Sequence, residues 1–227
     1  MALRATVFDL DDTLLDSGQA WERVCAGFVA RHGHTWTSED SATLHGNGNW
    51  PAFLARLCGN TVDRAAMVEQ CAATMAEDCA AGRIPTLPGA VELVRESECH
   101  GPVAIASASP RRFVHAALDH LGLRARTVIC GEDVAQGKPA PEPYLRAAAG
   151  LGLAPTECLA VEDSMNGIRS AAAAGCTVLA IPRAGTRLPD TVALLASVSA
   201  PNASDARLYL SRLLATPVPT LCAEAAR

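Results

Sequence analysis

The chain has 227 residues, of which 49% are hydrophobic and 19% are charged, and its formal net charge is −5. This composition excludes an intrinsically disordered chain, and the length suits one large domain or a core domain with an insertion. The negative charge, without any basic run, argues against nucleic-acid polymers as partners, and no apolar run reaches the roughly 18 residues that would cross a membrane.

The first predicted element is a strand at residues 6–10, the first of several short apolar runs typical of buried parallel strands. It follows the N-terminus directly and leaves no room for a signal peptide, so we expect a cytoplasmic protein. Residues 17–85 contain no convincing strand but show helical periodicity. We therefore predict an α-helical cap domain over residues 17–85, inserted after the first strand, with helices at residues 21–32, 50–57 and 62–80.

Strands and alanine-rich helices alternate in the rest of the chain. We expect strands at residues 103–107, 127–130, 158–161 and 177–181, and helices at residues 112–121, 141–151, 167–174 and 203–214. Gly122, Gly152 and Gly175 lie where helix-terminating glycines are common. The alternation predicts an α/β fold, a Rossmann-like, doubly wound parallel sheet built from residues 1–16 and 86–227.

Reactive side chains lie at the ends of three predicted strands and just before one predicted helix. Asp9, Asp11 and Asp12 lie within four residues, and like charges packed so closely are typical of a site for a divalent metal, a phosphoryl group or both. Later segments add a hydroxyl, an ammonium and two carboxylates: Ser107, Lys138, Glu162 and Asp163. Ligands of open α/β sheets bind beyond the carboxyl ends of the strands, so we expect all these residues at one edge of the sheet.

These residue types suit phosphoryl transfer from a small phosphorylated substrate. One carboxylate can attack phosphorus, and a second can protonate the leaving oxygen and later deprotonate water. A metal held by Asp9 and Asp163 would screen the nucleophile from an anionic substrate. The Lys138 ammonium and the Ser107 hydroxyl can bind the phosphoryl oxygens, over which negative charge is spread.

Four segments resemble, in this order, the four motifs of the haloacid dehalogenase-like phosphohydrolase superfamily: DLDDTLLDS, IASAS, GKPAPEPY and VEDSMNGIRSAAAAG. The resemblance covers about residues 5–185, and the helical insertion is similar to the cap of the β-phosphoglucomutase and sugar-phosphatase branch. It implies an aspartyl-phosphate intermediate and Mg²⁺ as the cofactor. It also implies a role for each motif residue: Asp9 as nucleophile, Asp11 as acid/base with its main-chain carbonyl on Mg²⁺, Ser107 and Lys138 as phosphoryl-binding groups, Asp163 as a Mg²⁺ ligand, and Glu162 as its support, directly or through water.

The chain also departs from the mutases of this branch. They carry a His near the position of Trp21, an Arg where this chain has Asn49, and a Lys that has no counterpart in residues 72–81. A cap without these groups is poorly suited to gripping a bisphosphate. We therefore predict hydrolysis of a small phosphomonoester, a sugar phosphate first and a nucleoside monophosphate or another biosynthetic phosphate ester next, by a monomer or a homodimer. A β-phosphoglucomutase-like phosphotransferase and a non-catalytic phosphate-binding module are the alternatives.

Further substrate-binding candidates each have a purely structural alternative. The loop Gly46-Asn47-Gly48-Asn49 either reaches the leaving group or forms a plain turn between helices. Trp21 is either a platform for the substrate or part of the cap core. Thr13 either donates to the phosphate or caps its turn, and Ala108 and Ser109 either offer backbone N–H groups to the phosphoryl group or form a turn.

Overall fold

A six-stranded parallel sheet forms the centre of the molecule. The computed structural model describes residues 2–45, 47–183, 187–193 and 195–214. The strand order is β3-β2-β1-β4-β5-β6, and every neighbouring pair is parallel. The strands are β1 (Ala5–Phe8), β2 (Val103–Ala106), β3 (Thr127–Ile129), β4 (Cys158–Glu162), β5 (Thr177–Ala180) and β6 (Val198–Ser199). The predicted α/β fold with a Rossmann-like sheet is confirmed.

The two faces of the sheet carry side chains of different size. Strands β1, β2 and β4 are buried along their whole length, as expected for strands covered on both faces. Because side chains alternate along a strand, Phe8 and Ile105 face one layer while Val7 and Ala104 face the other. The second layer is rich in alanine, which lets its helices approach the sheet closely.

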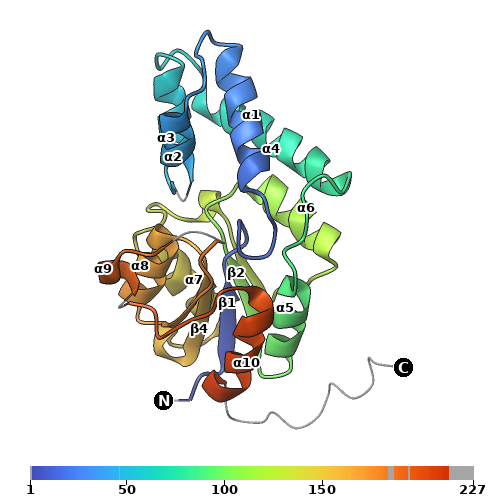
Figure 1. The fold of residues 1–227 in the computed structure, drawn as a ribbon, viewed down its shortest axis with the longest axis vertical. Coiled ribbons are helices and arrows are strands. Elements are labelled where there is room, and N and C mark those ends of the chain that lie inside the picture. Colours follow the sequence, from blue (N-terminus) through green and yellow to red (C-terminus); the bar gives the residue numbers. More distant parts are fainter. Residues whose placement is uncertain (1, 46, 184–186, 194, 215–227) are drawn as a thin grey trace.

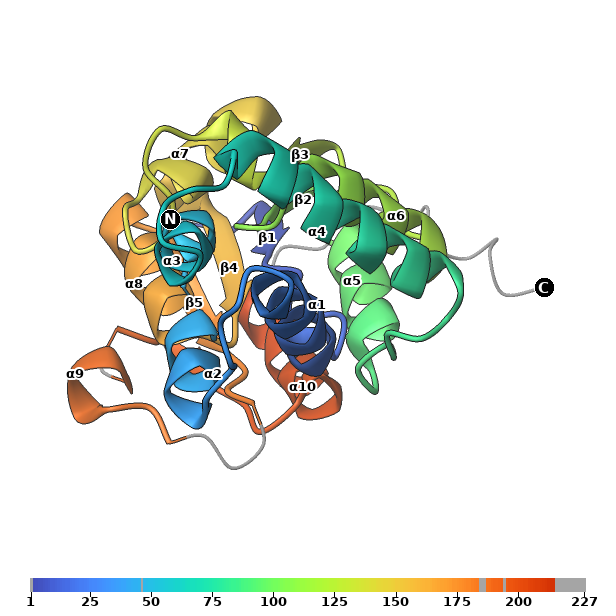
Figure 2. The same ribbon diagram turned by 90° about the horizontal axis from the view of Figure 1, so that it is seen from above.

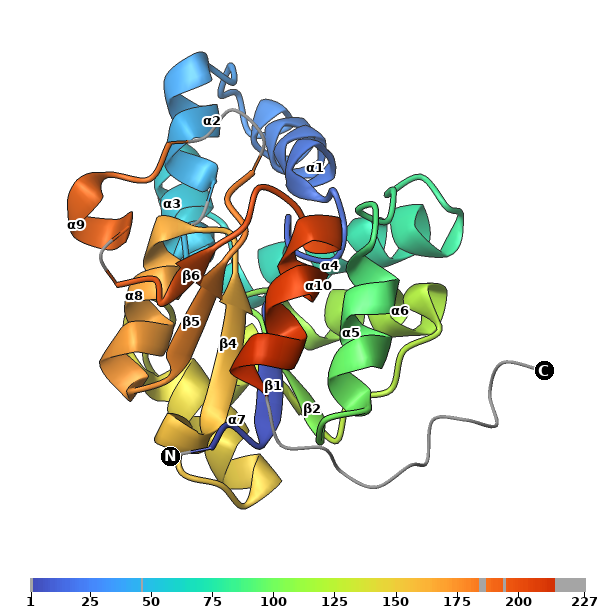
Figure 3. The same cartoon turned by 60° about the horizontal axis from the view of Figure 1, so that its bottom comes forward.

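Helices cover both faces of the sheet, as Figure 2 shows from above. The alanine-rich face packs against α7 (Glu142–Leu151) and α8 (Met165–Ala174). The other face packs against α5 (Ala90–Glu98) and α10 (Ala203–Leu213). These last two helices lie side by side in Figure 3. The remaining elements of this part are α6 (Arg111–Leu121), α9 (Asp190–Ala193) and the 3₁₀ turns η1 (Gly131–Asp133) and η2 (Pro155–Glu157). Among the described residues, no helix is long and apolar enough to cross a membrane.

Four helices lie together beyond one end of the sheet (Figure 1). They are α1 (Gly18–Ala30), α2 (Ser38–Leu44), α3 (Trp50–Leu57) and α4 (Arg64–Ala80). Helix α4 packs against both α1 and α6, so this helical group rests on the part that carries the sheet. We use the word cap for residues 17–85, whose status as a separate domain stays a prediction.

The element boundaries differ from the expected ones by a few residues. The first strand ends at Phe8 instead of residue 10, because the chain turns there and Asp12 adopts a left-handed conformation with φ of 56°. Helix α1 begins three residues earlier than expected, and α2, α5, α9 and β6 were not predicted. The three glycines expected to end helices do so, all with positive φ.

Candidate active site

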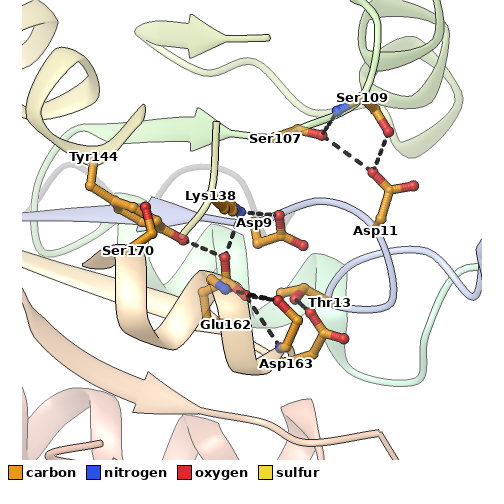
Figure 4. A network of polar contacts seen from close by, with 12 residues as sticks. Asp9, Asp11, Thr13, Ser107, Ser109, Lys138, Tyr144, Glu162, Asp163 and Ser170 are labelled. Atoms are coloured by element: carbon orange, nitrogen blue, oxygen red, sulfur yellow. Dashed lines mark hydrogen bonds and ion pairs between the residues drawn. The ribbon is translucent and has the colours of Figure 1, made fainter. Parts of the chain in front are cut away.

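The reactive side chains meet at the carboxyl ends of the parallel strands (Figure 4). Asp9 follows β1, Ser107 follows β2, and Glu162 and Asp163 end and follow β4. Lys138 comes from the loop before α7 and is buried, as are Asp9, Ser107 and Glu162, while Asp163 is partly exposed. Because all the strands run the same way, segments far apart in sequence deliver these groups to one place.

Lys138 is the centre of a buried ionic network. Its Nζ lies 2.5 Å from Asp9 Oδ1 and 2.5 Å from Glu162 Oε1. Burial alone would lower the pKa of Lys138, but the two carboxylates outweigh it and raise this pKa, so the ammonium keeps its charge. The hydroxyl of Tyr144 donates to the same Glu162 oxygen at 2.7 Å. Burial and the Glu162 charge raise the pKa of Tyr144, so this hydroxyl keeps its proton.

Three carboxylates crowd around this lysine. Oxygens of Asp9, Glu162 and Asp163 lie within 4.8 Å of one another. Burial raises the pKa of Asp9 to about 8. The positive charge of Lys138 opposes this rise, and the negative charges of Glu162 and Asp11 add to it. Burial and the charges of Asp9 and Glu162 also raise the pKa of Asp163 well above its usual range. Carboxylates that repel one another in this way fit a divalent cation, and an all-oxygen set fits Mg²⁺.

The members of this cluster are not equally open to a metal. Both Glu162 oxygens accept hydrogen bonds from the protein, Oε1 from Lys138 and Tyr144, and Oε2 from the backbone N–H and hydroxyl of Ser164 at 3.3 and 3.2 Å. Asp163 accepts a long bond from Thr13 Oγ1, at 3.3 Å. The cluster therefore offers Asp9 and Asp163 more readily than Glu162.

Asp11 has a different set of partners. Its Oδ1 accepts hydrogen bonds from the Ser17 hydroxyl at 2.7 Å and from the Trp21 indole N–H at 2.8 Å. Its Oδ2 accepts from the hydroxyls of Ser107 at 3.2 Å and Ser109 at 2.7 Å. Asp9 and Asp11 thus serve separate networks, one around Lys138 and one that joins the cap helix α1 to the loop after β2.

Cap residues close the other side of a cavity of about 110 Å³ above these groups. Its walls include Trp21 and Trp50, whose ring centroids are 5.2 Å apart, and the loop residues Asn47 and Gly48. A Cβ on Gly48 would collide with the Lys138 carbonyl oxygen, so only a glycine lets the cap loop lie this close to the lysine segment.

The remaining candidates fall in several places. Ala108 and Ser109 line the cavity, but the Ser109 N–H donates to Ser107 Oγ at 3.0 Å instead of pointing to an open phosphoryl position. Asn47 accepts from the Asn49 N–H through its side chain, which is a turn contact, and Asn49 lines a neighbouring larger cavity. Gly46 lies outside the described residues.

Comparison with known proteins decides the family. The family model described as haloacid dehalogenase-like hydrolase matches residues 3–175. The chain belongs to the haloacid dehalogenase-like hydrolases. Hexitol phosphatase A of Escherichia coli K12 is 37% identical over 187 residues, which cover 80% of this chain and 84% of that protein. Protein CbbY of Rhodobacter capsulatus is 34% identical over 204 residues, 84% of this chain and 90% of that protein.

Solved structures of similar proteins agree with this membership. The crystal structure of CbbY from Rhodobacter sphaeroides in complex with phosphate has a TM-score of 0.79 and 25% sequence identity, and the match covers 89% of this chain and 96% of that one. The resemblance of the four motifs to the haloacid dehalogenase-like superfamily is thus confirmed, while the individual residue roles stay predictions.

Sequence reasoning missed several residues of this haloacid dehalogenase-like site. Tyr144 closes the motif GKPAPEPY, yet nothing in the spacing showed that its hydroxyl would reach Glu162. Ser17 closes the motif DLDDTLLDS and Trp50 lies in the cap, but we predicted neither the contact of Ser17 with Asp11 nor the place of Trp50 in the cavity wall. A signal did exist for Gly48, because glycine in a loop often marks a close approach of two backbones.

Proposed function

We propose that the chain is a Mg²⁺-dependent phosphatase that hydrolyses a small phosphomonoester, with sugar phosphates as the preferred class, through an aspartyl phosphate on Asp9. The observation that supports it most strongly is the buried lysine network: an ammonium 2.5 Å from the carboxylate that would attack phosphorus. Family membership makes the chain a hydrolase, and relatives such as hexitol phosphatase A make it a phosphoric monoester hydrolase.

In this mechanism Asp9 and Lys138 act on the phosphoryl group. A carboxylate oxygen of Asp9 forms a bond to phosphorus while the bond to the leaving-group oxygen breaks. The Lys138 ammonium and the Ser107 hydroxyl bind the non-bridging oxygens and stabilise their charge. Asp9, Asp163 and the main-chain carbonyl of Asp11 would hold Mg²⁺, which when bound supplies positive charge that offsets the repulsion between nucleophile and substrate.

Asp11 is suited to move the proton. It donates a proton to the leaving oxygen in the first half of the reaction. In the second half it takes a proton from the water that attacks phosphorus, which breaks the bond to Asp9 and releases phosphate. The Trp21 indole N–H can only donate, so the oxygen that faces it stays an acceptor. The hydroxyls of Ser107 and Ser109 can turn and accept, so the oxygen that faces them can carry the proton.

The test is phosphate release from a panel of hexitol, hexose and nucleoside phosphates with Mg²⁺ present. We expect turnover of sugar phosphates, its loss in Asp9→Asn, and a phosphate adduct on the peptide that contains Asp9 after an acid quench. Asp16→Asn is the matched control, because Asp16 is partly exposed and lies outside the lysine network. Its Oδ1 is 3.7 Å from Arg183 Nη2. Retained turnover in Asp9→Asn refutes the nucleophile. Isomerisation of a hexose 1-phosphate without phosphate release would establish the mutase alternative.

A further inference from the structure

Tyr144 carries a hydroxyl in a place where a phenylalanine would pack equally well. Its side chain is fully buried in the alanine-rich layer between α7 and the sheet, among residues such as Ala104 and Ala160. Burying a hydroxyl costs free energy unless the group finds a partner. The partner here is Glu162 Oε1, at 2.7 Å. The aromatic ring explains the packing, but the hydroxyl needs a separate explanation.

The hydroxyl acts on the surroundings of Lys138. Glu162 Oε1 accepts from both Tyr144 and Lys138, so the two donors share one oxygen (Figure 4). The other oxygen of Glu162 is held by the Ser164 backbone and hydroxyl, which keeps the carboxylate from turning. The ring of Tyr144 also lies 5.3 Å from the Lys138 ammonium, within the range of a cation–π contact.

We propose that Tyr144 is a positioning residue that keeps the Lys138 ammonium available to the phosphoryl group. The inference rests on the proposed function, in which Lys138 binds the phosphoryl oxygens. Because the Tyr144 hydroxyl donates to Glu162 Oε1, it weakens the attraction between this oxygen and the Lys138 ammonium. Without the hydroxyl, Oε1 interacts with Lys138 alone and draws it away from Asp9 and from the incoming phosphoryl group.

Tyr144→Phe tests the hydroxyl while the ring stays in place. The first measurement is the Kd of inorganic phosphate by calorimetry with Mg²⁺ present, which should rise about tenfold, the order expected for one hydrogen bond to a charged group. The KM for a substrate should rise by a similar factor while kcat changes less, because Lys138 binds the phosphoryl group both before and during reaction. A purely structural hydroxyl would change the melting temperature alone.

The chain offers a matched control in its second tyrosine. Tyr209 lies on α10, on the opposite face of the sheet, so Tyr209→Phe should change neither phosphate affinity nor KM. Glu162→Gln supplies a second test, because it removes the charge that competes for Lys138. In that background Tyr144→Phe should alter the Kd of phosphate less than about twofold, a clear departure from additivity.

Each outcome decides the proposal. Phosphate affinity equal to wild type in Tyr144→Phe overturns it, and so do additive effects of Tyr144→Phe and Glu162→Gln. Failure of the proposed function has a different signature, because the wild-type protein itself would then bind no phosphate and release none from any substrate. That result would remove the role of Lys138 and the positioning role of Tyr144 with it.

Discussion

Gly167 is the position where adding a single methyl group should damage the site most. It lies in the first turn of α8, directly against the Glu162 carboxylate. A Cβ there would sit well inside 3.0 Å of the carboxyl carbon and of both oxygens. The carboxylate cannot retreat without losing bonds, because Lys138, Tyr144 and Ser164 all donate to it. We expect Gly167→Ala to displace Glu162 and disorganise the lysine network.

The size of the effect follows from the groups that must move. Overpacking a tight site costs about 1–3 kcal/mol, and a lost hydrogen bond to a charged group costs about 1.5–3 kcal/mol. Replacing a helical glycine by alanine returns about 1 kcal/mol. The free energy of unfolding should therefore fall by about 2–4 kcal/mol. In a chain of this length that lowers the melting temperature by about 5–15 °C.

Thermal and urea unfolding measure the change in stability, and phosphate release with Mg²⁺ measures the change in the site. Gly27→Ala is the matched control, since Gly27 is an exposed glycine of α1 whose added Cβ meets nothing closer than Arg31 Nη1 at 4.0 Å. It should stabilise the protein by about 0.5–1 kcal/mol. If Gly167→Ala behaved like Gly27→Ala, with unchanged turnover, Glu162 would not be held as we describe.

Three further changes test other parts of the molecule. Asp163→Asn should weaken Mg²⁺ binding measured by calorimetry, and an unchanged titration would contradict its ligand role. Gly48→Ala should lift the cap loop off the Lys138 carbonyl and lower kcat/KM by about tenfold or more, with little change in melting temperature. Burial would raise the pKa of Asp78, but hydrogen bonds from Arg83 and Arg23 outweigh burial and lower this pKa. These ion pairs therefore stabilise the fold at pH values above the unfolded pKa, and their contribution is lost as the pH falls through the folded pKa. Asp78→Asn should therefore lower the melting temperature at pH 7. Its difference from wild type should begin to shrink near about pH 4 and vanish only below the lowered folded pKa; a difference that grew in acid would contradict this sign.

The core of the site could be predicted because of a simple geometric rule. Residues that follow parallel strands must meet at one edge, so Asp9, Ser107 and Glu162 could be placed together from their position after apolar runs alone. Boundaries were less accurate where turn chemistry decided them, as at Asp12. Helix α5 was missed although its signal was present, since Ala90 and Leu93 begin the i, i+3, i+4, i+7 pattern of its buried face.

The cap contacts could not be predicted for a physical reason. The Trp21 indole reaches Asp11, and Gly48 touches the Lys138 segment, only because α1–α4 sit as a group over the sheet edge. The hydrophobic periodicity of a sequence predicts single helices and strands, but it does not predict how the cap helices are placed relative to the sheet. The same holds for Tyr144, whose burial was predictable from its helix but whose hydrogen-bond partner depends on how α7 lies against β4.

The charges at the sheet edge explain why separate motifs must act together. When all three are ionised, Asp9, Glu162 and Asp163 set three negative charges against the one ammonium of Lys138, and the raised pKa values of Asp9 and Asp163 reflect burial together with this crowding. A phosphoryl group adds further negative charge, which a divalent cation would offset. The lysine alone can neutralise either the nucleophile or the substrate, but not both. A second positive partner, such as the proposed Mg²⁺, would remove this conflict, and under our proposal Tyr144 influences how the single lysine charge is shared.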